Sequence, residues 1–288
     1  MATRSGVTET GSILDRIVAD ARADLERRKQ AEPEAALRAR FADYDAQWRL
    51  SDAIKTPRGR ARLSGRQAPA AAVQIVAEIK KASPSRGLLA ETLDPVAIAR
   101  AYTLGGATGI SVVTEPRYFL GDLAWLREVR LRLAAEFPGE RPSLLRKDFV
   151  TEGYEVVQAR AYGADTVLLI VALLEAPLLR DLIALARGIE LDALVEVHTE
   201  AEAERAVAAG ATLFGVNNRD LHTFEVDLGT TERIRPLLPV DAVVVGESGV
   251  HTRADVERLH KAGVRAILVG EAFMTAPDVA EKMAELRV

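Results

Sequence analysis

Residues 193–217, ALVEVHTEAEAERAVAAGATLFGVN, contain one complete unit of the pattern that decides the fold. A short apolar run (193–197) precedes an amphipathic segment (200–209), and a second short apolar run (212–217) follows it. Short runs rich in Val and Leu are typical of parallel strands buried on both faces, and the segment between them has the spacing of a helix. The stretch therefore predicts a strand, a helix and a second strand parallel to the first.

The same alternation fills the chain from residue 73 to its end. We predict strands over 73–80, 109–113, 143–147, 166–170, 193–197, 212–217, 242–247 and 266–270, and helices over 95–104, 123–137, 154–162, 177–187, 200–209, 231–237, 253–261 and 277–286. Eight strands, each followed by a helix, are what a closed (β/α)8 TIM barrel needs. The alternative, a doubly wound open sheet, usually has fewer strands and a glycine-rich first turn, which this sequence lacks.

The first 72 residues follow a different pattern. The apolar side chains on one face of a predicted helix are Ile13, Leu14, Ile17, Val18, Ala21 and Leu25. Ser12 and Asp15 are spaced as a capping box for that helix. Residues 28–69 are charged, rich in Ala and Arg, and weakly periodic. We therefore predict one structural domain, in which residues 1–72 form a helical extension and connector and residues 73–288 form the catalytic barrel.

The composition excludes several classes of function. The net charge is −4 without a basic domain, so we expect no nucleic-acid partner. There are no cysteines, which excludes disulfides, thiolate nucleophiles and zinc-thiolate sites. The sequence shows neither a signal-peptide pattern nor a long apolar segment, so we expect a cytoplasmic protein without a membrane partner. The dispersed His198, His222, His251 and His260 lack metal-ligand spacing, and each is expected in a loop or on a helix surface.

Five of the predicted strands become polar at the same end. The residues concerned are Glu78 and Lys80, Lys147, Glu196, Asn217 followed by Arg219, and Glu247. Side chains two apart on a strand point the same way, so Glu78 and Lys80 are expected to face the barrel mouth together. One such charge usually marks the start of a solvated loop, but five polar strand ends are hard to attribute to loop composition. Because barrel active sites lie at the C-terminal strand ends, the set predicts an acid–base site.

The last two strands end in small residues. Glu247-Ser248-Gly249-Val250 follows the seventh strand, and Gly270-Glu271-Ala272 follows the eighth. A single glycine here is more often a turn residue, but both together leave backbone N–H groups open to an anion at the place where barrels often bind phosphate. We therefore predict substrate contacts from Glu247, Ser248, Gly249, Gly270 and Glu271, and a small phosphorylated substrate.

These motifs, taken in order, resemble the indole-3-glycerol-phosphate synthase family of tryptophan biosynthesis. The matching segments are AEIKKASPS (77–85), LRKDF (145–149), LVEV (194–197), GVNNRDL (215–221), GESGV (246–250) and VGE (269–271). The predicted N-terminal helix is also similar, and only the first residues and residues 30–71 carry little of the likeness. One departure is Glu271, where some members of the family have Ser.

The resemblance implies a lyase, more narrowly a carboxy-lyase, without metal or organic cofactor. Its reaction would close the ring of 1-(2-carboxyphenylamino)-1-deoxyribulose 5-phosphate, with decarboxylation and dehydration, to give indole-3-glycerol phosphate. By resemblance, Lys147 is the general acid of ring closure and Glu196 the base of dehydration. A lysine serves as such an acid if desolvation or neighbouring cations lower its pKa. Lys80 would bind or activate the substrate, and which lysine donates which proton stays open.

The remaining roles also come from the resemblance. Glu78 and Asn217 would orient the reacting groups, while Arg219 and Ser83 would bind the substrate carboxylate, for which the planar fork of an arginine is suited. A monomer is expected.

Two other functions compete with this reading. A phosphoribosyl-anthranilate isomerase would share the phosphate loops, but it normally relies on a Cys–Asp pair, and this chain has no cysteine. A barrel retained only for binding or scaffolding would have lost its strand-end charges, and none is evidently lost.

Overall fold

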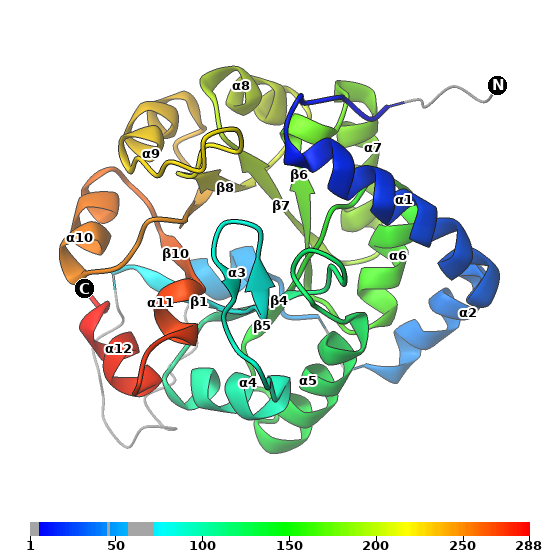
Figure 1. Cartoon of the computed structure of the whole chain (residues 1–288), viewed down its shortest axis with the longest axis horizontal. Coiled ribbons are helices and arrows are strands. Elements are labelled where there is room, and N and C mark those ends of the chain that lie inside the picture. Colours follow the sequence, from blue (N-terminus) through cyan, green and yellow to red (C-terminus); the bar gives the residue numbers. More distant parts are fainter. Residues whose placement is uncertain (1–5, 45–46, 57–71) are drawn as a thin grey trace.

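A closed barrel of eight parallel strands forms the centre of the computed structural model, which describes residues 6–44, 47–56 and 72–288 (Figure 1). The strands are β1 (Gln74–Ile79), β4 (Gly109–Val113), β5 (Ser143–Lys147), β6 (Thr166–Ile170), β7 (Asp192–Val197), β8 (Leu213–Asn217), β9 (Val243–Glu247) and β10 (Ala266–Val269). They pair in chain order, and β1 closes the barrel by pairing with both β4 and β10. The predicted (β/α)8 fold is confirmed, with every barrel strand within one residue of its expected bounds.

Helices surround the barrel. They are α4 (Pro95–Leu104), α5 (Leu123–Glu136), α6 (Gly153–Ala161), α7 (Ala176–Gly188), α8 (Glu200–Ala208), α9 (Gly229–Ile234), α10 (Arg253–Lys261), α11 (Glu271–Met274) and α12 (Val279–Glu285). The helix predicted over 231–237 ends as α-helix at Ile234 and continues as a 3-10 turn, Arg235–Leu237. Pro236 has no N–H to extend the α-helix, which accounts for the change.

The register of the strands aligns their polar ends. Ile170 pairs with Glu196, Glu196 with Gly215, and Asn217 with Glu247. Because neighbouring strands are parallel and end at similar heights, polar residues that are far apart in the sequence meet at one rim of the barrel. The opposite rim receives α3 (Leu50–Lys55), whose backbone N–H groups at Leu50 and Ser51 donate to Thr166 and Asp192.

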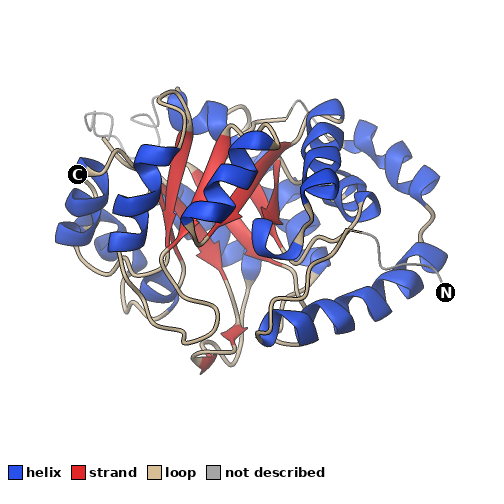
Figure 2. Cartoon of the chain, turned by 90° about the horizontal axis from the view of Figure 1, so that it is seen from above, coloured by secondary structure: helices blue, strands red, loops and turns tan. Residues whose placement is uncertain are grey.

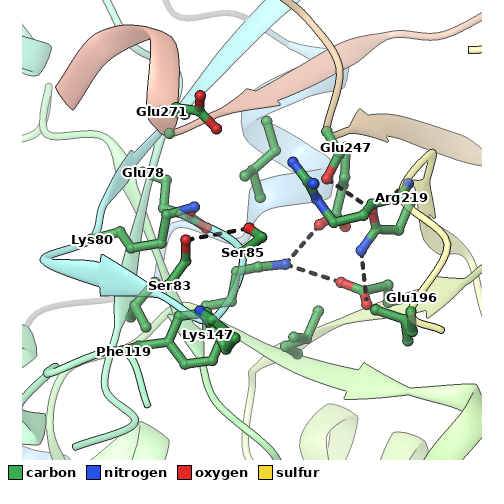
Figure 3. Close-up of a pocket in the computed structure, with 18 of the residues that line it drawn as sticks. Glu78, Lys80, Ser83, Ser85, Phe119, Lys147, Glu196, Arg219, Glu247 and Glu271 are labelled. Carbon is green, nitrogen blue, oxygen red and sulfur yellow. Dashed lines mark hydrogen bonds and ion pairs between the residues drawn. The ribbon is translucent and has the colours of Figure 1, made fainter. Parts of the chain in front are cut away.

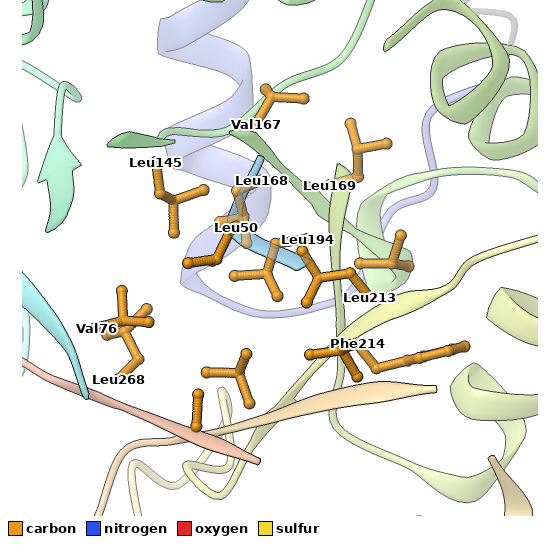
Figure 4. Close-up of a cluster of buried hydrophobic side chains, with 14 of the residues drawn as sticks. Leu50, Val76, Leu145, Val167, Leu168, Leu169, Leu194, Leu213, Phe214 and Leu268 are labelled. Carbon is orange, nitrogen blue, oxygen red and sulfur yellow. The ribbon is translucent and has the colours of Figure 1, made fainter. Parts of the chain in front are cut away.

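Apolar side chains fill the barrel between the two rims (Figure 4). This core includes Val76, Leu145, Leu168, Leu194 and Leu268, all buried. Leu50 enters the same core from α3 and is fully buried. The scarcity of aromatic residues is thus met by aliphatic packing, and each fully buried aliphatic side chain contributes roughly 1.5–3 kcal/mol of hydrophobic stabilisation.

The N-terminal helix α1 (Ile13–Ala31) lies at the C-terminal mouth of the barrel, and the structure continues through α2 (Glu34–Ala39) and a 3-10 turn, Arg40–Asp43 (Figures 1 and 2). The hydroxyl of Tyr118 donates to Asp20 at 2.7 Å, and that of Tyr154 to the carbonyl of Glu32 at 2.7 Å. These contacts hold the middle and the C-terminal end of α1. The division of the chain at residue 72 stays a prediction, since residues 57–71 lie outside the described part.

The start of α1 corrects one expectation. Ser12 is the N-cap residue and accepts from the N–H of Leu14 at 3.2 Å. The N–H of Asp15 does not donate to the Ser12 hydroxyl, and the Asp15 carboxylate accepts from Thr10 and Gly11. The chain turns back before Ser12, so earlier amides come within reach of the Asp15 carboxylate and the capping box does not form.

A short hairpin after β1 was not predicted. Its strands are β2 (Ala82–Ser83) and β3 (Gly87–Leu88), and it lies at the same end of the barrel as α1 (Figures 1 and 2). Gly87 has a φ of +67°, which favours glycine at the turn. Among the residues that the structure describes, none of the helices has the length and apolar character needed to cross a membrane.

Candidate active site

A cavity of about 190 Å³ opens at the C-terminal mouth of the barrel (Figure 3). All twelve candidate residues line it: Glu78, Lys80, Ser83, Lys147, Glu196, Asn217, Arg219, Glu247, Ser248, Gly249, Gly270 and Glu271. Their meeting follows from the strand register, because each one is among the last two residues of a barrel strand or lies in the segment that follows the strand. The catalytic and binding roles of these residues stay predictions.

Lys147, the last residue of β5, lies at the centre of the cavity (Figure 3). Its ammonium is 3.0 Å from Oε2 of Glu196 and 2.7 Å from Oε2 of Glu247. Burial lowers the pKa of Lys147, but Glu196, Glu247 and Glu78 outweigh burial and raise this pKa above its ordinary value. The condition expected for a lysine acid, a lowered pKa, is therefore not met, because carboxylates rather than cations surround this amine.

Glu247 ends β9 and shares the ammonium with Glu196. Burial and the neighbouring Glu196 raise the pKa of Glu247 to about 7, against the opposing effect of Lys147. Two carboxylates around one ammonium titrate as a coupled pair. The sequence grouped Glu247 with the phosphate loops, but its carboxylate is directed to Lys147.

Glu196 is held from three sides. Besides Lys147, Nδ2 of Asn217 donates to its Oε1 at 3.3 Å, and Nε2 of His198 lies 3.3 Å from the same oxygen. Burial raises the pKa of Glu196, but Lys147 and His198 more than offset burial and lower it below the ordinary value. Asn217 is fixed in turn, because its Oδ1 accepts from the hydroxyl of Ser248 at 2.9 Å.

Glu78 and Lys80 face the cavity together, as their spacing on β1 predicts. The Lys80 ammonium lies 2.7 Å from Oε1 of Glu78, and the hydroxyl of Ser111 donates to Oε2 at 3.4 Å. Gly270 leaves room for this carboxylate, since a Cβ there would be 2.6 Å from Oε1 of Glu78. This ion pair forms the wall of the cavity opposite Glu196.

The predicted phosphate end has a distinctive backbone. Ser248 and Gly249 both have a positive φ, +63° and +80°. This conformation is uncommon for a serine, and strain of this kind tends to persist where function requires it. Glu271 forms an ion pair with Arg86 of the β2–β3 hairpin at 2.7 Å. The hairpin is thereby tied to the loop that follows β10.

One wall of the cavity is apolar, and its residues were not among the predicted site residues. Ile13, Leu14 and Ile17 of α1 line the cavity, as do Phe119 and Phe149, whose rings are 5.9 Å apart. The helical periodicity identified the face of α1 but not its destination, and Phe119 lies in an irregular segment without a signal. The wall is an apolar surface next to charged groups.

His198 lies in the loop between β7 and α8, as expected, but its burial was not foreseen. Its side chain is only 9% exposed and lies between Glu196 and Glu202. Its position two residues after Glu196 was a usable signal, since residues two apart on a strand face the same way. Within the described ranges, no group of three or more His, Asp or Glu side chains is arranged to hold a metal ion.

Comparison with known proteins agrees with the geometry. The family model described as indole-3-glycerol phosphate synthase matches residues 14–286. The protein named indole-3-glycerol phosphate synthase from Dehalococcoides mccartyi (strain CBDB1) is 46% identical to this chain over 275 residues. The match covers 95% of this chain and 99% of the relative. The one from Nocardioides sp. (strain ATCC BAA-499 / JS614) is 48% identical over 267 residues, covering 93% and 95%.

Solved structures extend the likeness of the barrel. A 3-hexulose-6-phosphate synthase superposes with a TM-score of 0.56 at 17% identity, over 74% of this chain and 98% of that one. A thiamine phosphate pyrophosphorylase from Pyrococcus furiosus gives 0.55 at 22% identity, over 75% and 93%. At such identities these structures show the fold alone. The family model and the relatives cover nearly the whole chain, and the chain belongs to the indole-3-glycerol phosphate synthase family.

Proposed function

We propose that this chain converts 1-(2-carboxyphenylamino)-1-deoxyribulose 5-phosphate to indole-3-glycerol phosphate, with Lys147 as general acid and Glu196 as general base. Membership of the family supports the reaction. The observation that carries the assignment of roles is the position of one ammonium between two buried carboxylates, 3.0 and 2.7 Å away, in the cavity at the barrel mouth.

Ring closure requires a proton at the ketone oxygen while the ring carbon that bears the carboxylate attacks the ketone carbon. The Lys147 ammonium is the proposed donor. Its raised pKa keeps it fully charged, so it stabilises the negative charge that develops on the oxygen. An alkoxide is more basic than a lysine amine, so the proton moves to oxygen as the carbon–carbon bond forms. The raised pKa of Lys147 is therefore compatible with its proposed role as general acid.

Loss of carbon dioxide then restores the aromatic ring. The substrate ring would lie against the wall formed by Phe119, Phe149 and the first turns of α1. A carboxylate that leaves as neutral carbon dioxide gains from an apolar surrounding, because only the starting state carries the charge. Arg219 and Ser83 also line the cavity and are proposed to orient this carboxylate before it leaves.

Dehydration completes the indole ring. The Glu196 carboxylate removes a proton from the carbon beside the nitrogen, and the hydroxyl leaves as water with a proton from Lys80, or from Lys147 once Lys147 has been reprotonated from solvent. Asn217 orients Glu196 through its amide at 3.3 Å. The phosphate would lie near Ser248, Gly249, Gly270 and Glu271, where the two left-handed residues reverse the chain.

The test follows indole fluorescence after the substrate is mixed with the purified chain. Lys147→Ala and Glu196→Gln should each lower kcat by about 100-fold or more, as expected for loss of a general acid or base. Lys261→Ala on α10 is the matched control, because this lysine is exposed and far from the cavity. Wild-type turnover in either site variant, with an unchanged melting temperature, contradicts the role of that residue.

A further inference from the structure

The side chain of His198 lies between Glu196 at the cavity and Glu202 of helix α8. It follows β7, and its Nε2 is 3.3 Å from Oε1 of Glu196. On the other side, Nδ1 lies 3.2 Å from Oε2 of Glu202, and the backbone N–H of His198 donates to the same oxygen at 2.7 Å. Glu202 is itself fixed, because its N–H donates to the N-cap hydroxyl of Thr199. The imidazole is thus held in one orientation from behind.

We infer that His198 is a positioning residue for the general base, an imidazolium clamped between Glu196 and Glu202 that keeps the Glu196 carboxylate ionised and aimed at the substrate. The inference rests on the proposed role of Glu196. It adds a residue that does not touch the substrate and that acts through the base.

The electrostatics of the cluster agree with the geometry. Burial lowers the pKa of His198, but contacts with Glu196 and Glu202 outweigh burial and raise this pKa to about 10. Lys147 faces Glu196 from β5, and Arg219 lines the same second pocket of about 440 Å³ as His198. That pocket also contains Glu200 and Arg233. With two carboxylates in contact, the imidazole carries a positive charge throughout the neutral range.

A second cation beside Glu196 matters because the first is consumed. Lys147 is the nearest positive charge to Glu196, but it gives up its proton in the proposed ring closure. Without another cation, Glu196 and Glu247 would then form an isolated, buried pair of carboxylates, and one of them would take up a proton. The charge of His198 does not change in that step, so Glu196 stays ionised until it removes the proton in dehydration.

A purely structural role makes a different prediction. The bond from the His198 backbone to Glu202 secures the start of α8, and it persists whatever side chain is present at residue 198. Variants of the ring therefore separate the support of the helix from the effect on Glu196. His198→Gln keeps an uncharged donor near the position of Nε2, while His198→Leu removes both the donor and the charge.

The experiment measures kcat and KM from pH 4 to 9 for the wild type, both variants and Glu202→Gln, together with melting temperatures. Removing a positive charge at this distance raises the pKa of a carboxylate by about one unit or more. We expect His198→Leu to shift the acid limb of kcat upward by about one pH unit and to lower the maximal kcat about tenfold, with KM little changed. His198→Gln should recover much of the maximal kcat but not the position of the limb. Glu202→Gln should give a smaller shift, because His198 keeps one carboxylate.

His260→Gln on the exposed face of α10 is the matched control and should leave the profile unchanged. A wild-type pH profile in His198→Leu overturns the inference, as does a loss of kcat that follows only a loss of melting temperature. The Glu196→Gln variant distinguishes failure of the inference about His198 from failure of the proposed function. If Glu196→Gln is inactive while His198→Leu is normal, only the inference fails, whereas an active Glu196→Gln removes the base on which it rests.

Discussion

Gly215 is the residue whose substitution tests the packing of the site most directly. It lies in β8 beside Glu196, and the space above its Cα is taken by the Glu247 carboxylate. A Cβ at this position would overlap Oε1 of Glu247 and lie 3.1 Å from its Cδ, whereas the nearest other atom, Cδ1 of Leu194, would be at an ordinary 3.5 Å. Gly215→Ala therefore displaces one carboxylate and disturbs little else.

The displacement needed to relieve the overlap is about 1 Å, and a misplacement of that size in a catalytic array costs up to about 100-fold in rate. We expect kcat to fall between about 10-fold and 100-fold. Stability should hold, because alanine is favoured over glycine in a strand by roughly 0.5–1 kcal/mol, which offsets a small strain. Steady-state kinetics by indole fluorescence and thermal unfolding give the two readouts. Gly188→Ala at the end of α7, where a Cβ would meet nothing within 4 Å, is the control.

A double-mutant cycle isolates the cause. In a Glu247→Ala background the carboxylate is gone, so adding Gly215→Ala should lower kcat no further. A Gly215→Ala enzyme within twofold of the wild type would refute the reasoning. An equal loss of kcat in both backgrounds would refute it as well, since the damage would then come from elsewhere in the barrel.

Three further predictions concern other parts of the molecule. Glu271→Ser removes a carboxylate from the predicted phosphate end and should lower KM severalfold. Arg86→Ala leaves Glu271 without its ion pair and should raise KM. Steady-state kinetics measures both changes. Asp165→Ala removes the buried carboxylate that two buried arginine side chains share and should lower the free energy of unfolding in urea by about 3–5 kcal/mol, with kcat of the folded enzyme retained. The raised pKa of His198 stabilises the fold fully below pH 6.5 and loses this effect as pH rises through about 10, so His198→Leu should flatten the decline of unfolding free energy across that window.

Local patterns explain why so much of the fold followed from the sequence. The eight strands and most of the helices were predicted because short segments of the sequence are enough to show burial on two faces or helical periodicity. The polar strand ends gave the candidate site by the same reasoning, since parallel strands of similar length bring their ends to one rim. The exceptions are short elements with little periodicity, such as the β2–β3 hairpin and α3. The first amides of α3 donate to partners more than 100 residues away, which no local pattern contains.

The chemistry of the site depends on distances that no local pattern contains. Glu196 and Glu247 lie 49 and 100 residues after Lys147 in the sequence. Only closure of the barrel brings the three side chains together. The pKa of a buried group is set by the charges a few ångströms away, so no sequence pattern could predict that carboxylates hold the Lys147 ammonium. The same holds for His198, whose burial between two glutamates depends on the packing of α8. The sequence by itself determined the barrel and the twelve residues at its mouth, because these depend on periodicity. The tertiary structure alone decided which charges meet, because Coulomb interactions depend on distance in space.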